Sequence, residues 1–359
     1  MSGSVWPITR CADAVAVETF RAPDDLPAEA AHLFRTPAQD LFGSRAWYDT
    51  VLTHAMAPGA EACFALCRIA GQPAALFPLQ TLPDGSLANL SNVYTCRWAP
   101  LLADGLDGAA RREIAARFAA FCRRYPTTRL DALDADDAGS AAFLGGARTA
   151  GLVPLQFTHF GNWHEPVGGL GWQRYLAARP GALRETVRRK LKRDADRTFD
   201  VVTGRTGLEA GIAAFETVYR QSWKDPEPFP DFNAALMRQA AALGVLRLGV
   251  LRIAGIPAAA QLWVLEGDRA TVLKLAHDEA LKSASPGTVL TALMLQRLLD
   301  EESIAEIDFG RGDDPYKRAW ASERRQRLGV VLANPRRVGG LAALARHALG
   351  RARARLRPG

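Results

Sequence analysis

The 359-residue sequence predicts a mixed α/β (α+β) protein built from two similar units followed by a basic helix. The chain is longer than the size at which one hydrophobic core usually stops growing, so two domains are expected. An octapeptide also occurs twice, and both copies sit in the same predicted order of strands, turns and a helix. With 48% hydrophobic and 23% charged residues, the composition is that of a folded globular protein rather than a disordered chain.

The recurring octapeptide is RIAGQPAA at residues 68–75 and RIAGIPAA at residues 252–259, which differ at one position. The Ala-Gly pair in each copy predicts a tight hairpin turn, because glycine tolerates a positive φ. A chance match is the alternative, and the shared order of the later elements disfavours it. The strands expected around the two turns cover residues 62–69, 74–82, 246–253 and 258–266.

Similar elements follow each copy. In the first copy these are a turn at 83–86, a short strand, a helix over 108–125 and a strand over 128–133. In the second copy they are a turn at 267–269, a strand over 270–277, a helix over 286–302 and a strand over 304–309. Glycines near residue 168 mark the break between the copies. The predicted boundaries are therefore 1–165 for a degenerate first unit, 166–335 for the second unit and 336–359 for a basic tail.

Cysteine usage and charge exclude some classes of protein. The five cysteines include no CxxC pair, which argues against a disulfide framework and against a zinc site, so no metal is expected. The chain shows neither a secretory signal nor an apolar run approaching the roughly 20 residues that cross a bilayer, so we expect a cytoplasmic protein. The net charge of +7 is concentrated at 184–197 and 336–357, and such patches suit phosphates, anionic lipids or nucleic acid equally well.

The first candidate site is the sequence KLAHDEALKSASPGT, which begins at Lys274. Ser285 is a good helix N-cap, Pro286 suits the first helical position, and Gly287 removes a side chain where the first-turn N–H groups point outward. Free amides and the positive end of the helix dipole make an anion site, to which Lys274 and Lys282 can add charge. A pyrophosphate is the expected ligand, and an ordinary capped helix is the alternative.

The second candidate site is the sequence EIDFGRGDDPYKRAW near the end of the second unit. Asp308 is expected to end a strand, and Pro315 to open a helix that carries Tyr316 and Lys317. Groups at strand ends and helix starts face the ligand crevice of open α/β folds. A tyrosine can donate a proton, and a lysine can stabilise an oxyanion or a phosphate. Two further candidates, for which helix capping or core packing is the alternative, are Asp313 and Trp320.

Together these motifs resemble the bacterial GNAT-like acetyltransferases associated with cellulose and exopolysaccharide biosynthesis. That family is similar to the Fem peptidoglycan aminoacyltransferases, which also use tandem GNAT units. The resemblance covers roughly residues 40–330 and is strongest over 223–320. It implies two tandem GNAT units and a donor substrate (acetyl-CoA, another acyl-CoA or an acyl carrier thioester) rather than a tightly bound cofactor. The usual GNAT donor loop is Gln/Arg-x-x-Gly-x-Gly/Ala, whereas this chain has Lys282-x-x-Ser285-x-Gly287.

The resemblance also implies a direct transfer with defined roles for individual residues. The thioester would lie along the strand that ends at His277, with His277 or Asp278 as general base and Tyr316 as general acid. Lys317 is the first residue to mutate, and Asp308 is a further catalytic candidate. The donor-binding candidates are Lys274, Leu275, Ala276, Lys282, Ser285, Pro286, Gly287 and Thr288. The acceptor-binding candidates are Trp223, Arg188, Arg189, Asp313 and Trp320.

Three functions remain as hypotheses. The first is an acyltransferase for an amine or hydroxyl on a small molecule or on a lipid- or sugar-linked acceptor, in cell-envelope or exopolysaccharide biosynthesis, with an acyl carrier protein as a candidate partner. The second is an aminoacyl-tRNA-dependent Fem-like ligase, which the absence of sustained heptads disfavours. The third is a non-catalytic scaffold or nucleic-acid-binding protein, which the intact motifs disfavour.

Two basic segments carry separate expectations. A helix over 183–197 would recognise phosphate on an acceptor or carrier, with a solvated helix face as the alternative. A basic amphipathic helix is predicted over 341–357. This second helix is either a frayed, solvated tail or a contact with the inner face of the membrane.

Overall fold

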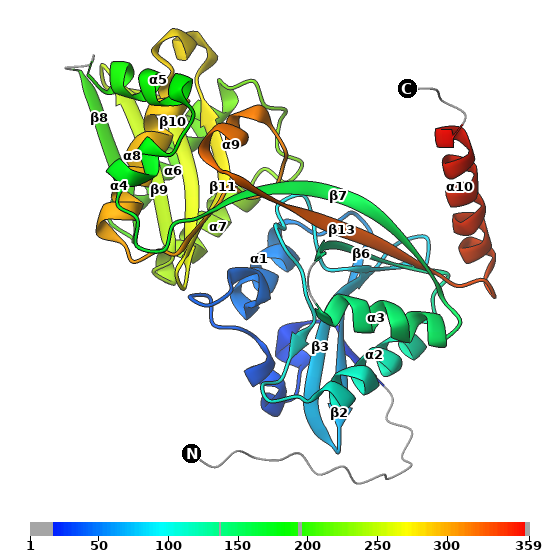
Figure 1. The fold of residues 1–359 in the computed structure, drawn as a ribbon. Helices are drawn as coiled ribbons and strands as arrows, with labels where there is room; N and C mark the ends of the chain where they lie inside the picture. The colour runs from blue at the N-terminus through cyan, green and yellow to red at the C-terminus, as the bar shows by residue number, and fades with distance from the viewer. Residues whose placement is uncertain (1–16, 136–137, 193–195, 356–359) are drawn as a thin grey trace. The chain divides into compact units, whose positions relative to one another are not determined.

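A computed structural model describes residues 17–135, 138–192 and 196–355. The chain divides into two compact units (Figure 1). The first unit comprises the described parts of Met1–Arg35, Met56–Phe160 and Gln326–Gly359, and the second comprises Thr36–Ala55 and Gly161–Arg325. The predicted fold class, mixed α/β with two units, is confirmed. The sequence-based boundaries are consecutive segments, whereas in the structure residues 36–55 belong to the second unit and the segment after 325 belongs to the first.

The first unit is a sheet in the order β1-β2-β3-β4-β6-β13, with β5 beside β3. Strands β4 and β6 are parallel, and the pairs β2–β3, β3–β4 and β6–β13 are antiparallel. The strands are β1 (Glu18–Phe20), β2 (Glu61–Ile69), β3 (Gln72–Thr81), β4 (Leu87–Asn89), β5 (Leu101–Leu102) and β6 (Thr127–Asp134). The helices are η1 (Pro23–Asp25), η2 (Ala28–Leu33), α2 (Gly108–Cys122), α3 (Ala138–Thr149) and α10 (Val338–Arg355). Strands β7 (Val153–Pro166) and β13 (Glu323–Ala333) contribute residues to both units.

The second unit is a sheet in the order β7-β12-β11-β10-β9-β8. Only β11 and β12 are parallel among these pairs of described strands. The strands are β8 (Arg197–Val202), β9 (Leu246–Ile253), β10 (Ile256–Glu266), β11 (Arg269–His277) and β12 (Glu306–Asp308). The first helices are η3 (Leu41–Gly43), α1 (Arg45–His54), α4 (Trp172–Ala177), α5 (Gly181–Leu191) and α6 (Leu208–Arg220). The later helices are α7 (Phe232–Ala242), η4 (Glu279–Ala284), α8 (Pro286–Glu301) and α9 (Pro315–Trp320).

The two copies of the octapeptide form equivalent hairpins. Each Ala-Gly turn has two positive φ angles, 48° and 78° at residues 70–71 and 50° and 77° at residues 254–255. Each hairpin also has the same bulge one residue after its proline, at Ala74 and at Ala258, because the residues on either side of each alanine pair with adjacent residues of the partner strand. A proline beside a bulge is tolerated in a strand because a ladder hydrogen bond is already missing there. The shared turn and bulge confirm the internal repeat.

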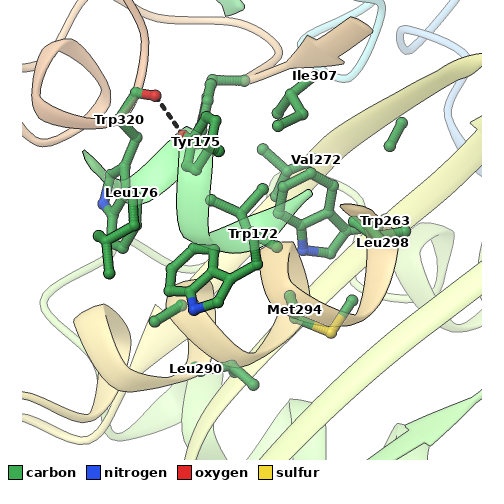
Figure 2. Close-up of a cluster of buried hydrophobic side chains, with 14 of the residues drawn as sticks. Trp172, Tyr175, Leu176, Trp263, Val272, Leu290, Met294, Leu298, Ile307 and Trp320 are labelled. Carbon is green, nitrogen blue, oxygen red and sulfur yellow. Dashed lines mark hydrogen bonds between the residues drawn. The ribbon is translucent and has the colours of Figure 1, made fainter. Parts of the chain in front are cut away.

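The core of the second unit holds α8 against the sheet. Figure 2 shows Trp172, Trp263 and Met294 among the packed side chains of this buried cluster. Helix α8 approaches β9 closely because residue 249 is glycine, where an added Cβ would lie 2.4 Å from the Sδ of Met294. This packing fixes where the first turn of α8 emerges from the sheet.

The bounds of two predicted helices differ from expectation. The prediction of a basic helix over 183–197 was wrong at the helix end, because α5 stops at Leu191 and Arg197 begins β8. The segment from Arg197 pairs with β9 along its length, so ladder hydrogen bonds replace helical ones. The tail helix begins at Val338, and its predicted last residue, Arg357, lies outside the described residues.

The described residues contain no cluster of histidine, cysteine or acidic side chains that could hold a metal ion. Four of the cysteines (Cys63, Cys67, Cys96 and Cys122) are buried free thiols, and Cys11 lies outside the described residues. Within the described ranges, no helix combines the length and the hydropathy that a membrane crossing requires.

Candidate active site

The candidate site of the second unit lies where two parallel strands separate. Strands β11 and β12 pair over only three residues, from Arg269 opposite Glu306 to Thr271 opposite Asp308. Strand β12 then ends, whereas β11 continues to His277 with β10 on its other side. Leu273 is an extra residue in β11, since its two neighbours pair with adjacent residues of β10. A bulge of this kind bends the strand and increases its twist, which helps to open the gap beside β12.

The gap leads into a cavity of about 550 Å³ inside the second unit. Five segments line it: the second half of β11, η4 through Lys282, the start of α8, the start of α9 with the loop before it, and Trp223–Lys224. Both motifs found in the sequence therefore meet in one cavity, as predicted. Of the donor-binding candidates, only Ala276 is absent from the lining, and it is buried.

The first turn of α8 presents backbone amides to this cavity. Ser285 is at the N-cap position and Pro286 is the first helical residue, as predicted. The side chain of Ser285 makes no capping hydrogen bond, because its backbone is left-handed (φ 55°, ψ 47°) rather than extended. The predicted capping role of this hydroxyl is therefore wrong. Gly287 and Thr288 line the cavity, and their first-turn amides have no cap from the Ser285 side chain, as an anion site requires.

Gly287 also allows β11 and α8 to approach each other. A Cβ added at Gly287 would lie 3.1 Å from Cδ2 of His277, which is tighter than an ordinary van der Waals contact. The His277 ring is also 4.6 Å from the ring of Trp223, whose side chain is half exposed at the cavity mouth. The histidine thus lies between the amide cluster and the mouth, within the cavity lining.

Tyr316 ends a chain of four hydrogen bonds that runs through the interior. The indole nitrogen of Trp263 donates to Oε1 of Gln261 (2.8 Å), and Nε2 of Gln261 donates to Oγ1 of Thr291 (2.5 Å). The hydroxyls of Thr291 and Tyr316 are 2.5 Å apart, and the Tyr316 hydroxyl donates to the carbonyl of Gly287 (3.2 Å). Because the indole N–H of Trp263 can only donate and the carbonyl of Gly287 can only accept, the protons of this chain are directed toward the first turn of α8.

The same environment keeps Tyr316 protonated. Burial raises the pKa of its hydroxyl well above the ordinary value, and the hydrogen bond from Thr291 opposes that shift only in part. Tyr316 therefore ties α9 to the carbonyl beside the amide cluster. A general-acid role would require the hydroxyl to exchange this hydrogen bond for one to the leaving group.

The cavity lining carries an excess of positive charge. Lys317 is buried, and its Nζ donates to the carbonyl of Arg311 (2.5 Å) and lies 3.8 Å from Oδ2 of Asp314. Lys274 pairs with Glu227 (2.6 Å). The remaining cations of the lining are Lys224, Lys282 and Arg311, against one acidic residue, Asp314. This balance favours an anionic ligand.

Lys224 is a cation of this lining with a lowered pKa. Burial lowers its pKa, and the charges of Lys274 and Lys317 lower it further. Its Nζ lies 5.5 Å from the ring centre of Trp223 and 5.9 Å from that of Tyr219, so aromatic faces partly replace water around the ammonium group.

Three of the proposed site residues have structural partners instead of cavity contacts. Asp308 accepts hydrogen bonds from Asn162 (2.6 Å), from the amide of Gly310 (2.7 Å) and from Arg325 (2.6 Å). It therefore holds the turn after β12. Asp278 is buried and caps η4 through the amide of residue 280 (2.8 Å). Trp320 is fully buried in the hydrophobic cluster of Figure 2, where its carbonyl accepts a hydrogen bond from the Tyr175 hydroxyl.

The acceptor candidates divide in the same way. Trp223 lines the cavity, as described above. Asp313 pairs with Arg324 and accepts a hydrogen bond from the indole of Trp163 (2.7 Å), so it lies outside the lining. Arg188 and Arg189 are exposed on α5 and are likewise absent from the lining.

Arg311, Thr291 and Gln261 were missed as site residues. Arg311 lies within the second motif that the sequence did single out, so proximity was the available signal. Thr291 is a hydroxyl on the apolar face of α8, four residues after Gly287, which is a weak signal for a buried polar role. No pattern in the sequence indicates that Gln261 on β10 reaches this helix.

In the first unit the strand edge that corresponds to the gap beside β11 is already hydrogen-bonded, although a cavity of about 890 Å³ lies beside Trp98 and the start of α2. Beyond the short parallel pairing of β4 with β6, the side chain of Asn89 bonds both the carbonyl (3.0 Å) and the amide (2.9 Å) of Asp131. The amide of Trp98 donates to the carbonyl of Ala132 (3.0 Å), and the Trp98 side chain is buried. Asn89 and Trp98 thus occupy the edge of β6 that would have to be open for a ligand.

The fold is similar to that of several solved structures. The match with the crystal structure of FemX covers 88% of this chain and 98% of that chain, with 12% identity and a TM-score of 0.59. A conserved protein of unknown function from Bacteroides thetaiotaomicron gives a TM-score of 0.56 at 11% identity, covering 88% of this chain and 99% of that one. The C-terminal domain of a putative lysylphosphatidylglycerol synthetase from Agrobacterium fabrum gives a TM-score of 0.52 at 14% identity. That match covers 78% of this chain and 87% of that chain. At these identities the likeness concerns the fold alone.

No curated protein matches the sequence. Residues 181–318 match the family described as acetyltransferase (GNAT) domain. This range contains every residue that lines the cavity of the second unit. The matching segment lies within the second unit, which is therefore similar to a GNAT acetyltransferase domain over this range.

Proposed function

We propose that the second unit transfers an acyl group, acetyl in the simplest case, from a CoA or carrier thioester to an amine or hydroxyl acceptor. One observation carries the proposal: the gap beside β11 and the uncapped amides of Gly287 and Thr288 line the same basic cavity. A thioester donor has a pantetheine arm and, in CoA, a pyrophosphate. The cavity offers a strand edge for the first and an amide cluster for the second.

Each part of the donor has a proposed partner. The pyrophosphate binds the amides of Gly287 and Thr288, with the exposed ammonium of Lys282 adding charge. The pantetheine lies against β11 from Val272 to Leu275, where its amide groups pair with the strand edge that β12 leaves open. GNAT domains typically use acyl-CoA as a donor substrate, so no tightly bound cofactor is part of the proposal.

The reaction is a direct transfer. The acceptor nitrogen or oxygen attacks the thioester carbonyl carbon, the carbon–sulfur bond breaks, and the acceptor loses a proton while the thiolate gains one. His277 is the proposed base because it lies between the cavity mouth and the amide cluster. Tyr316 is the proposed acid because burial keeps it protonated. Lys317 holds the loop carbonyl of Arg311 and adds positive potential to the site.

The acceptor side of the proposal is coarser. Trp223 and Lys224 at the cavity mouth provide an aromatic face and a partly desolvated cation. These groups suit a sugar ring or an anionic group on the acceptor. A lipid- or sugar-linked acceptor of cell-envelope or exopolysaccharide biosynthesis at the cytoplasmic side of the membrane is consistent with them.

Calorimetry with separate donors tests this function. Acetyl-CoA, longer acyl-CoAs and an acyl carrier protein are titrated into the wild type and into Gly287→Trp, whose indole would fill the space beside His277. We expect binding of at least one donor to the wild type and none to the variant, with thermal melting as the check that the variant is folded.

Two single lysine variants, one inside and one outside the cavity lining, provide a matched control for the donor site. Lys282→Gln removes a cation that lines the cavity, and Lys192→Gln removes an exposed cation on the same unit that does not. Only the first should weaken acyl-CoA binding, by about three- to tenfold at low salt. Absence of heat for every donor, or equal affinities in wild type and Gly287→Trp, would overturn the donor-site assignment. Binding of aminoacyl-tRNA alone would favour the ligase function instead.

A further inference from the structure

Helix α10, the last element of the first unit in Figure 1, is fixed only at its beginning. An added Cβ at Gly340 would lie 1.9 Å from the carbonyl oxygen of Asn334, and one at Gly339 would lie 2.9 Å from Cβ of Pro126. The side chain of Asn334 in turn donates to the carbonyl of Arg123 (2.8 Å). The start of the helix is therefore set closely against the loop before β6, which gives the exposed part of α10 a fixed direction within the first unit.

The outer face of α10 is an apolar stripe. Val338, Leu341 and Leu349 are 85%, 53% and 60% exposed, and they account for three of the eight exposed large hydrophobic side chains among the described residues. At about 100° per residue these three positions fall on one side of the helix. The small residues that complete the stripe are Ala342, Ala345, Ala348 and Ala352. The opposite side, with Gly340 and Ala343, is buried.

Arginines border this stripe on one side. Arg346 and Arg353 lie along that border, Arg351 lies further round the helix, about 20° from Gly340, and all three are exposed. No aspartate or glutamate follows Glu323 anywhere in the sequence. Arginine can lay its aliphatic stem beside an apolar surface while its guanidinium binds phosphate bidentately. The helix thus combines an apolar face with a basic border.

We propose that α10 binds the surface of an anionic lipid bilayer, with Leu341 and Leu349 in the acyl boundary and the arginines on lipid phosphates. The charges decide between this occupant and the others. A second copy of α10 would place one arginine border against another without any acidic partner. Nucleic acid would engage the arginines but would leave the leucines in water. A bilayer interface satisfies both features at once.

Vesicle co-sedimentation of the full-length protein tests the proposal. The probes are vesicles of phosphatidylcholine alone and vesicles with about one-third phosphatidylglycerol, at about 0.1 M salt. We expect binding to the anionic vesicles only, and loss of most of it at about 0.5 M salt. The double variant Leu341→Gln/Leu349→Gln should lower the partition coefficient about a hundredfold. The double variant Arg346→Gln/Arg353→Gln should lower it about 30-fold.

A matched control separates insertion from general surface hydrophobicity. Ile256 in the second unit is 57% exposed, close to the two leucines, so Ile256→Gln removes a comparable apolar side chain without touching α10. It should bind vesicles as the wild type does. Equal binding of the leucine double variant and the wild type would overturn the proposal. Self-association abolished by the leucine variant, without vesicle binding, would assign the stripe to a second copy of the chain. Because no acyl donor is present, the result is independent of the proposed function.

Discussion

The hydrogen-bonded chain behind the amide cluster makes a quantitative prediction for Thr291→Val. Valine keeps the shape of threonine but removes the hydroxyl that accepts from Gln261 and contacts Tyr316. Thr291 and Gln261 are each only 1% exposed, so water cannot replace the lost partner. A buried donor left without an acceptor costs about 1–3 kcal/mol, and the weakened hydrogen bonding of Tyr316 adds about 1 kcal/mol. We expect a total loss of about 2–4 kcal/mol in the free energy of unfolding.

The matched control is Thr291→Ser, which keeps the hydroxyl and loses one methyl group, at a cost of about 1 kcal/mol. Urea unfolding followed by tryptophan fluorescence measures the free energy of unfolding of both variants, because Trp263 is the first donor of the hydrogen-bonded chain. Valine should be the more destabilising substitution even though it buries more carbon. A valine variant as stable as the serine variant would refute the hydrogen-bonded chain.

Two further predictions concern the cavity lysines. Lys317→Ala should abolish most turnover. It should also lower the free energy of unfolding by about 2 kcal/mol, since the carbonyl of Arg311 loses a charged donor. Full activity at a temperature where the variant is folded would remove Lys317 from the mechanism. Burial lowers the pKa of Lys224, so above that pKa and up to about 10.5 the unfolded state holds more protons than the folded state, and stability should rise with pH in this window. Urea titrations from pH 7 to 10.5 should show this rise in the wild type and a smaller one in Lys224→Met, and identical slopes would contradict it.

Local patterns were the part of the fold that the sequence could predict. Pro286 and Pro315 each open a helix as expected, because proline fixes φ and needs no N–H partner at that position. The Ala-Gly turns followed from the conformational freedom of glycine. These features depend on a few consecutive residues, and a single sequence contains that information.

Features that depend on distant residues could not be predicted. The segment with α1 joins the second unit because Trp47 packs on Phe232 with ring centres 5.7 Å apart, and the amide of Leu41 donates to Glu266 (2.6 Å). Likewise Asp308 pairs with Arg325 and Asn162, which lie 17 and 146 residues away. The sequence shows such residues as polar groups near a motif and gives no sign that their charges are already neutralised by partners.

The central claim is that a donor diphosphate lies on the first turn of α8, and a crystal structure with acetyl-CoA tests it most directly. The account predicts the pyrophosphate within about 3 Å of the amide nitrogens of Gly287 and Thr288, and the thioester beside Leu275 in the gap that β12 leaves. Acetyl-CoA bound in any other place, with the cavity beside Gly287 left empty, would contradict it.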